Sequence, residues 1–156
     1  MKKISLTGKY GKGKSLLLDD EDYEKFTCMG LRFRLSNEGY VVFGGNAKAV
    51  HRIIMNAPKG TFIDHINHDK LDNRKSNLRI CTNQQNSMNR KPYKGKSSKY
   101  KGVSYIKKLD KFQAMIQANG KPKFLGRFKT EEEAAKKYNE AALEYFGEFA
   151  YLNDIK

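Results

Sequence analysis

The chain has 156 residues and a formal net charge of +14. This length fits one ordinary domain or two small ones, and the charge attracts polyanions, with nucleic acid favoured over a membrane surface. No stretch reaches the ~20 apolar residues of a membrane-spanning helix, and no export signal follows Met1. We therefore expect a cytoplasmic protein with no membrane partner. Cys28 and Cys81 lack paired spacing, which disfavours a structural zinc site.

The first segment with a recognisable spacing is GKYGKGKS, at residues 8–15. It matches the phosphate-binding loop of nucleotide hydrolases, which needs a buried strand before it and a helix that begins at its Lys-Ser pair. Here the preceding residues are few and polar, and the acidic run DDEDYE follows closely. We therefore predict a basic, glycine-rich turn between two short strands, and no nucleotide cofactor.

Two further strand patterns, LRFRLS and GYVVFGG, fall within residues 1–50. They predict a small β module, with DDEDYE as an acidic patch on it. The residues of this module do not indicate a function by themselves.

The densest group of polar residues lies at 61–90. A short strand pattern at 61–65 is followed by a turn rich in Asn, Asp and Lys. A second strand pattern at 77–80 comes next, and Thr82 begins a polar helix. The predicted order is strand, loop, strand and helix.

Polar side chains lie at the end of the first of these strands and one turn into the helix. A unit of this size can bring Asp64, at the strand end, beside Asn86 in the helix. Two oxygen ligands suit a hard cation such as Mg²⁺ that keeps its waters. His65 points to the other side of the strand and can take a proton from water near pH 7. The pattern predicts a metal and a base on either side of one phosphate.

By these residues the chain resembles the HNH endonucleases of the phage and intron-encoded homing type. The resemblance runs from HRII through DHINHDKLDNRKSNL to TNQQN. It implies that Asp64 and Asn86 bind a divalent metal ion, Mg²⁺ or Mn²⁺, and that His65 is the general base. It also implies that Asn77 holds the loop in place, and that the substrate is double-stranded DNA. We expect His51 to be structural.

A cationic stretch, KPYKGKSSK at residues 91–99, has the composition of a flexible linker between modules. Three strand patterns follow, KYKGVSYI, KFQAMIQA and KPKFLGRF, and the Asn-Gly pair between the last two predicts a tight hairpin. In KFQAMIQA, apolar and polar residues alternate, so one face of the sheet is apolar. TEEEAAKKYNEAALEYFG predicts a helix capped by Thr130 and ended by Gly147, with an apolar stripe that packs on the sheet.

This arrangement resembles the ethylene-response-factor DNA-binding domain, over about residues 98–154. The resemblance rests on YKGV, FQAMI, FLGRF, EEAAKKYNEAAL, FGEFA and a closing Leu-Asn. In that family the sheet lies in the major groove of DNA. Where the family has Arg and Trp on the strands, this chain has Lys, Ser, Ile106 and Phe124, so phosphate contacts are favoured over base readout. The DNA-facing residues implied by the resemblance are Lys101, Ser104, Lys108, Met115, Gln117 and Lys123.

We predict an α+β protein. Residues 1–92 form an HNH nuclease domain, with a β region at 1–50 and a ββα-metal core at 51–90. A linker at 93–97 leads to residues 98–156, a three-stranded antiparallel sheet packed on one α-helix.

The predicted activity is metal-dependent hydrolysis of phosphodiester bonds by a site-specific, homing-type nuclease of a phage or mobile element. It would act in the cytoplasm of a bacterial or phage-infected cell. The alternative is a non-catalytic DNA-binding regulator that keeps an HNH fold. A third possibility, an RNA-binding protein, rests on charge alone.

Overall fold

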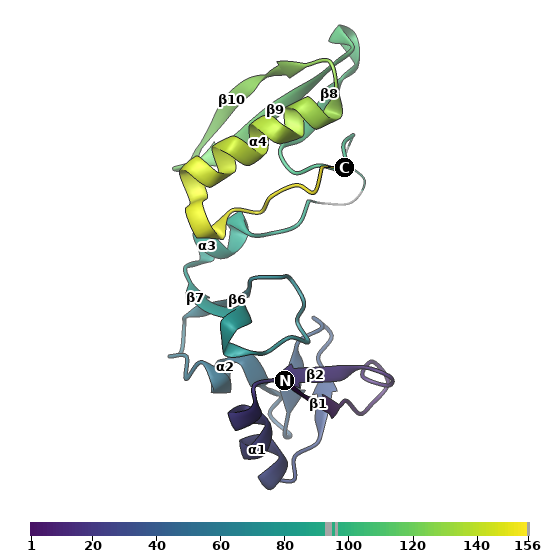
Figure 1. Cartoon of the computed structure of the whole chain (residues 1–156), viewed down its shortest axis with the longest axis vertical. Helices are drawn as coiled ribbons and strands as arrows, with labels where there is room; N and C mark the ends of the chain where they lie inside the picture. Colours follow the sequence, from purple (N-terminus) through teal and green to yellow (C-terminus); the bar gives the residue numbers. More distant parts are fainter. Residues whose placement is uncertain (93–94, 96, 156) are drawn as a thin grey trace. The chain divides into compact units, whose positions relative to one another are not determined.

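The computed structural model describes residues 1–92, 95 and 97–155. It contains two compact units, Met1–Asn86 and Ser87–Lys156 (Figure 1). Small antiparallel sheets and helices make up both units, which confirms the predicted α+β class. Among the described residues, no helix has the length and apolar character needed to cross a membrane.

The first unit begins with a hairpin of two strands, β1 (Lys2–Ser5) and β2 (Ser15–Leu18). Residues 6–14 form the turn between them, as predicted. Ser15 starts a strand where a phosphate-binding loop would start a helix, so the structure lacks the helix terminus that such a loop requires.

The acidic run that follows forms a helix, α1 (Asp20–Cys28), which the sequence analysis did not predict. Three acidic residues lie in its first turn, where they stabilise the positive end of the helix dipole. Phe26, in its last turn, is buried. The acidic patch is therefore the start of a helix that contributes to the core.

A small meander of β3 (Phe33–Leu35), β4 (Val41–Phe43) and β5 (Lys48–Ala49) comes next. It leads directly into a short helix, α2 (Val50–Ile54). β3 and β4 lie where LRFRLS and GYVVFGG predicted strands, whereas the two-residue β5 was not predicted.

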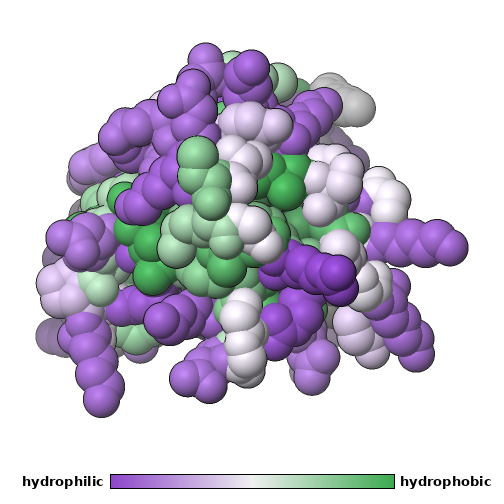
Figure 2. Space-filling view, turned by 90° about the horizontal axis from the view of Figure 1, so that it is seen from below, coloured by the Kyte–Doolittle hydropathy of each residue, from purple (hydrophilic) through white to green (hydrophobic). Residues whose placement is uncertain are grey.

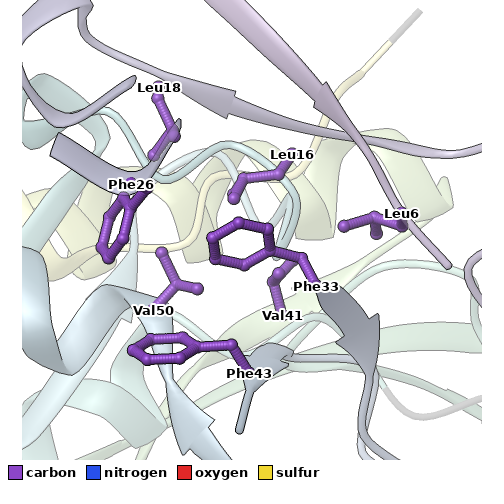
Figure 3. Close-up of a cluster of buried hydrophobic side chains, with 8 residues drawn as sticks. All are labelled: Leu6, Leu16, Leu18, Phe26, Phe33, Val41, Phe43 and Val50. Atoms are coloured by element: carbon purple, nitrogen blue, oxygen red, sulfur yellow. The ribbon is translucent and has the colours of Figure 1, made fainter. Parts of the chain in front are cut away.

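The core of the first unit lies between the hairpin, α1 and the meander (Figure 3). Three of its rings pack edge to face, with centroids 5.6 to 5.8 Å apart, a geometry that aromatic pairs prefer. At the end of this unit, hydrophobic residues gather near the middle of the surface and hydrophilic side chains surround them (Figure 2). The buried core residues are Leu6, Leu16, Leu18, Phe26, Phe33, Val41, Phe43 and Val50.

The predicted strand, loop, strand and helix follow in that order. β6 (Phe62–His65) and β7 (Leu78–Cys81) pair antiparallel. The loop between them ends in a 3-10 turn, η1 (Lys75–Asn77). The helix, α3 (Asn83–Met88), starts directly after Thr82, as expected.

The second unit contains a three-stranded antiparallel sheet in the order β10-β9-β8. β8 (Val103–Ile106) is followed by a 3-10 turn, η2 (Lys107–Leu109), and then by β9 (Lys111–Ala118) and β10 (Lys121–Phe128). The Asn-Gly pair between the last two strands has positive φ at both residues, 52° and 74°, the conformation that the predicted hairpin turn requires.

One face of this sheet is covered by α4 (Glu131–Phe146). Thr130 and Glu133 form the predicted capping box, and Gly147 ends the helix. The helix lies close to the sheet because small and aromatic residues alternate on its inner side. A Cβ on Gly102 would lie 2.0 Å from the ring of Tyr138, so only glycine fits there. The buried helix residues are Ala134, Ala135, Tyr138, Ala141, Ala142 and Phe146.

Residues 87–92 belong to the second unit, ahead of the linker predicted at 93–97. The side chain of Met88 packs against the core of that unit, and the ammonium of Lys101 donates hydrogen bonds to backbone carbonyls in this segment. α3 therefore spans the boundary between the two units. Residues 93, 94 and 96 of the predicted linker lie outside the described residues.

Candidate active site

β6 ends in two buried polar side chains, Asp64 and His65, which are 7% and 5% exposed. Consecutive residues of a strand point to opposite faces. The register places Arg79 across from Asp64 and Leu78 across from His65. The carboxylate and the imidazole therefore have different surroundings.

The carboxylate of Asp64 is paired with the guanidinium of Arg79. Asp64 Oδ2 accepts hydrogen bonds from Nε at 3.0 Å and from Nη2 at 2.7 Å, and both side chains are nearly buried. Charge-assisted bonds of this kind are among the strongest in proteins. Arg79 was not a predicted site residue. The hairpin register could have found it, because cross-strand neighbours on one face interact.

Asn77 ties together the loop that follows His65. Its Oδ1 accepts from the backbone N–H of Asn67 at 3.0 Å, and its Nδ2 donates to the carbonyl of Asp72 at 2.7 Å. Its own carbonyl accepts from the N–H of Ile66 at 2.9 Å. These bonds fit the loop-holding role expected of Asn77, whose part in cleavage stays a prediction.

A second polar centre supports the same loop. Asp72 is 2% exposed and accepts hydrogen bonds from Arg74 Nε at 2.7 Å, from Arg74 Nη2 at 2.6 Å and from Asn67 Nδ2 at 2.9 Å. The guanidinium of Arg74 lowers the pKa of the Asp72 carboxyl. This ion pair was not predicted, and it stabilises the loop from within.

The imidazole of His65 lies in a cluster of rings. Its centroid is 5.4 Å from that of His51 and 6.1 Å from that of Tyr40. Tyr40 and His51 are 5.0 Å apart, and the ammonium of Lys70 lies 4.0 Å from the centre of the Tyr40 ring. His51 is thus packed against the predicted base.

Burial sets the protonation of both histidines. It lowers the pKa of His65, while the Asn73 side chain and the charge of Asp64 oppose the shift. It also lowers the pKa of His51, to about 4. Both imidazoles are therefore neutral at pH 7, and a neutral imidazole is the form that can accept a proton.

Asn86 is half-buried in α3. The helix start is fixed by reciprocal bonds: Thr82 N–H donates to Gln85 Oε1 at 2.8 Å, and Gln85 N–H donates to Thr82 Oγ1 at 3.1 Å. The N–H of Asn86 donates to the carbonyl of Thr82 at 3.0 Å. Asn86 therefore lies in the first turns of a capped helix, as predicted.

The donor set for a metal ion is small. Among residues 1–92, 95 and 97–155, no three or more His, Cys, Asp and Glu side chains gather closely enough to hold a metal ion. Asp64 and Asn86 would contribute one carboxylate and one amide oxygen. A site with only two oxygen donors suits Mg²⁺, because this ion keeps several of its waters when it binds to protein.

Comparison with known proteins identifies the module that carries these residues. A family model described as HNH endonuclease matches residues 48–88. An uncharacterised HNH endonuclease of Acanthamoeba polyphaga mimivirus is 40% identical over 131 residues, which cover 80% of this chain and 67% of the relative. This chain belongs to the HNH endonuclease family. The prediction of an HNH-type enzyme is confirmed.

A second relative of this HNH family member is Protein 3.8 of Escherichia phage T7, which is 38% identical to it over 64 residues. The match covers 41% of this chain and 53% of that protein, so the chain spans about half the length of this relative. No solved structure gives a significant match. These comparisons bring no evidence for an ethylene-response-factor domain, and that assignment stays a prediction.

Beyond the HNH module, the sheet of the second unit has one open face. The register places Ser104 and Met115 on the side away from α4, and both are exposed. Gln117 shares this side and is also exposed. Lys108 is exposed but lies in η2, beyond the end of β8, so it is not on a strand of the sheet.

Two of the lysines predicted to face DNA are directed elsewhere. Lys101 Nζ donates to the carbonyls of Met88 at 2.5 Å and Arg90 at 2.8 Å, and burial lowers its pKa to about 8. Lys123 pairs in register with buried Ile116, and its ammonium donates to the Tyr145 hydroxyl at 3.1 Å. Both charges are used within the unit, which corrects the expectation that they point outward from the sheet.

Sequence reasoning missed two residues of the open face. Phe124 pairs in register with Met115 and is 58% exposed, and Arg127 pairs with Gln113. The Arg127 guanidinium lies 5.6 Å from the Phe124 ring centre, a cation–π contact. A bulge between Phe124 and Gly126 shifts the alternation, and for this reason the sequence pattern alone did not place Arg127 on this face.

Proposed function

We propose that this chain is a metal-dependent DNA endonuclease that hydrolyses phosphodiester bonds, of the homing type found in phages and mobile elements. The observation that carries the proposal is the buried Asp64–His65 pair at the end of β6, within the segment that matches the HNH model. Asn77 holds the loop next to this pair. We expect the enzyme to act in the cytoplasm of a bacterial or phage-infected cell.

In this proposal His65 takes a proton from the attacking water. Its lowered pKa keeps the imidazole neutral at pH 7, and a base must be unprotonated to act. The rings of His51 and Tyr40 pack against it, so it is held in one orientation. Such packing keeps a catalytic group within the narrow range of geometry that the reaction requires.

Asp64 and Asn86 would hold the cation, Mg²⁺ or Mn²⁺. When bound, the cation polarises the phosphate and stabilises the charge on the leaving oxygen. Arg79 holds the Asp64 carboxylate in a fixed orientation through its two hydrogen bonds. Arg79 is therefore a positioning residue for this ligand.

The second unit is proposed to bind double-stranded DNA with the open face of its sheet, in the manner of an ethylene-response-factor domain. The three-stranded sheet with one covering helix supports this assignment. The proposed contact residues are Ser104, Lys108, Met115 and Gln117, with Phe124 and Arg127 added from the structure. A guanidinium can contact phosphates or the edge of guanine.

The experiment that tests the proposed function is cleavage of plasmid DNA. We expect supercoiled plasmid to be converted to nicked or linear DNA in Mg²⁺ or Mn²⁺ and to stay intact when EDTA is added. Binding without cleavage in either metal would favour the alternative, a non-catalytic DNA-binding regulator. Cleavage that persists in EDTA would contradict the metal dependence.

A further inference from the structure

The turn at residues 6–14 is basic, and its shape is closely determined. Backbone bonds cross it: Leu6 N–H donates to the Lys14 carbonyl at 3.0 Å, and Lys14 N–H donates to the Gly11 carbonyl at 2.9 Å. A Cβ on Gly11 would lie 2.5 Å from the carbonyl oxygen of Thr7. Only glycine fits there, so the turn has one compact conformation.

This compact turn presents three cations to solvent. Lys9, Lys12 and Lys14 are all exposed, and no acidic residue occurs in residues 1–18. Within the described part of the chain, none of the three lies in an ion pair. Lys75 of the same unit, by contrast, is paired with Glu21 at 2.9 Å. The charge of the turn is therefore available to an external anion.

An aromatic ring and a hollow accompany these charges. Tyr10 is 57% exposed, and the ammonium of Lys9 lies 5.8 Å from its ring centre. A hollow of about 310 Å³ lies beside the turn. Its walls combine a ring, an ammonium and polar groups of the β3–β4 turn, a surface that suits a sugar and phosphate. The lining residues are Tyr10, Lys14, Leu35, Ser36, Asn37 and Gly39.

β2 connects the basic turn to the loop of the HNH motif. Leu17 N–H donates to the carbonyl of Leu71 at 2.8 Å, and Asn73 N–H donates to the carbonyl of Leu17 at 2.9 Å. Lys14 precedes Leu17 by about 10 Å of strand, at ~3.3 Å per residue. That length equals roughly three base pairs along a DNA helix, at ~3.4 Å per phosphate of one strand.

We propose that this basic turn, residues 6–14, is a second contact surface for duplex DNA, and that Lys9, Lys12 and Lys14 bind backbone phosphates close to the bond that is cut. The inference rests on the proposed nuclease function. Because the turn is hydrogen-bonded through β2 to the HNH loop, it holds the substrate at the nuclease module independently of the sheet in the second unit.

Duplex DNA fits this surface better than a membrane does. The turn exposes three lysines and one ring, and its single aliphatic side chain, Leu6, is buried in the core. Membrane-surface segments instead combine charge with a broad exposed apolar face. Phosphates at regular spacing match several cations held at fixed positions. Anionic vesicles and single-stranded RNA serve as competing partners in the test.

The test compares three triple variants of the full chain by fluorescence anisotropy with duplex DNA in EDTA, over a range of NaCl concentrations. The first replaces Lys9, Lys12 and Lys14 by Ala. The matched control removes the same amount of charge from helices α1 and α4. It combines Lys25→Ala, Lys136→Ala and Lys137→Ala. A third variant replaces the three turn lysines by Arg.

We expect the turn variant to lower the slope of log affinity against log salt by about 0.9 for each phosphate that is no longer neutralised. The control and the Arg variant should keep the wild-type slope. The melting temperature should not change, since all three side chains are exposed. Equal slopes for the turn variant and the control would overturn the proposal, as would an effect confined to vesicles or RNA.

Plasmid cleavage by the wild type separates this proposal from the proposed function. If the wild type cuts plasmid and the turn variant keeps its slope, only the second contact surface is wrong. If the wild type binds duplex DNA and cuts nothing, while the turn variant has a lower slope, the contact surface stands and the nuclease activity is wrong.

Discussion

The guanidinium of Arg79 donates two hydrogen bonds to one carboxylate oxygen of Asp64, at 3.0 Å and 2.7 Å, from the neighbouring strand of the β6–β7 hairpin. Their side chains are only 11% and 8% exposed. The proposed metal ligand is thus in contact with a fixed cation of the protein. Arg79 and a divalent cation would share the same carboxylate.

Removing Arg79 should make the stability of the nuclease unit depend on metal. Arg79→Met removes one member of a nearly buried ion pair, a change that typically costs about 3–5 kcal/mol. Urea unfolding with and without Mg²⁺ measures the effect, and we expect Mg²⁺ to restore more stability to the variant than to the wild type. The double variant with Asp64→Asn should recover stability without metal. If Mg²⁺ stabilises the wild type, the single variant and the double variant equally against urea, Asp64 is not a metal ligand.

His65→Ala should abolish cleavage and leave DNA binding intact. A general base acts on water in the transition state and contributes ~10²–10⁴ to the rate, but it adds little to the affinity for uncut DNA. Single-turnover cleavage and anisotropy, measured on the same protein preparation, separate the two effects. Cleavage at close to the wild-type rate would show that another group is the base.

The open face of the second unit should bind DNA through Arg127 and Phe124. Replacing both by Ala is expected to weaken binding and to lower the salt slope by about 0.9, because one phosphate is no longer neutralised. Lys123→Ala is the matched control, because its ammonium is bonded to Tyr145 on the helix side. If the control weakens binding as much as the double variant does, the sheet binds DNA by a different face.

Truncation after residue 92 should loosen the last turn of α3. It removes Lys101, whose ammonium binds the carbonyl of Met88, and the core against which Met88 packs. A six-residue helix has little stability of its own. Hydrogen exchange of the amide of Asn86 should therefore be faster in the truncated chain. The full chain with Arg127→Ala keeps these interactions and should exchange like the wild type, and unchanged exchange after truncation would contradict the expectation.

As the pH is lowered from 6.5, the free energy of unfolding should decrease because of His51. Burial lowers its pKa to about 4 in the folded protein, whereas the unfolded chain has the ordinary value near 6.5. Between these values the unfolded chain takes up a proton that the folded state does not, so the free energy of unfolding decreases as pH falls, by up to about 1.4 kcal/mol per pH unit. His51→Phe should flatten this part of the curve in urea unfolding from pH 7 to 5. An identical pH dependence in both proteins would show that another group is responsible.

The sequence alone was sufficient where structure depends on neighbouring residues. The Asn-Gly turn before Lys121, the capping box of Thr130 and Glu133 and the alternation in β9 are local properties of the backbone, and all three formed as predicted. The HNH module was recognised in the same way, from residue types at short spacing. The sequence did not predict α1, because its acidic residues also suit an exposed turn, and the packing of Phe26 helps to decide for a helix.

Only the tertiary structure decided which groups the charged side chains contact. The sequence predicts that Lys101 and Lys123 lie on strands. It does not predict that the Lys101 ammonium binds the end of α3, or that the Lys123 ammonium binds a tyrosine of α4. Arg79 meets Asp64 because of the hairpin register, and Arg127 reaches the open face because a bulge shifts the alternation of β10. Lys101, Lys123 and Arg79 each contact a group that lies many residues away in the sequence. The position of Arg127 depends on one bulge in the pairing of β9 and β10. Electrostatic contacts of this kind follow from the packed geometry, which composition and spacing do not contain.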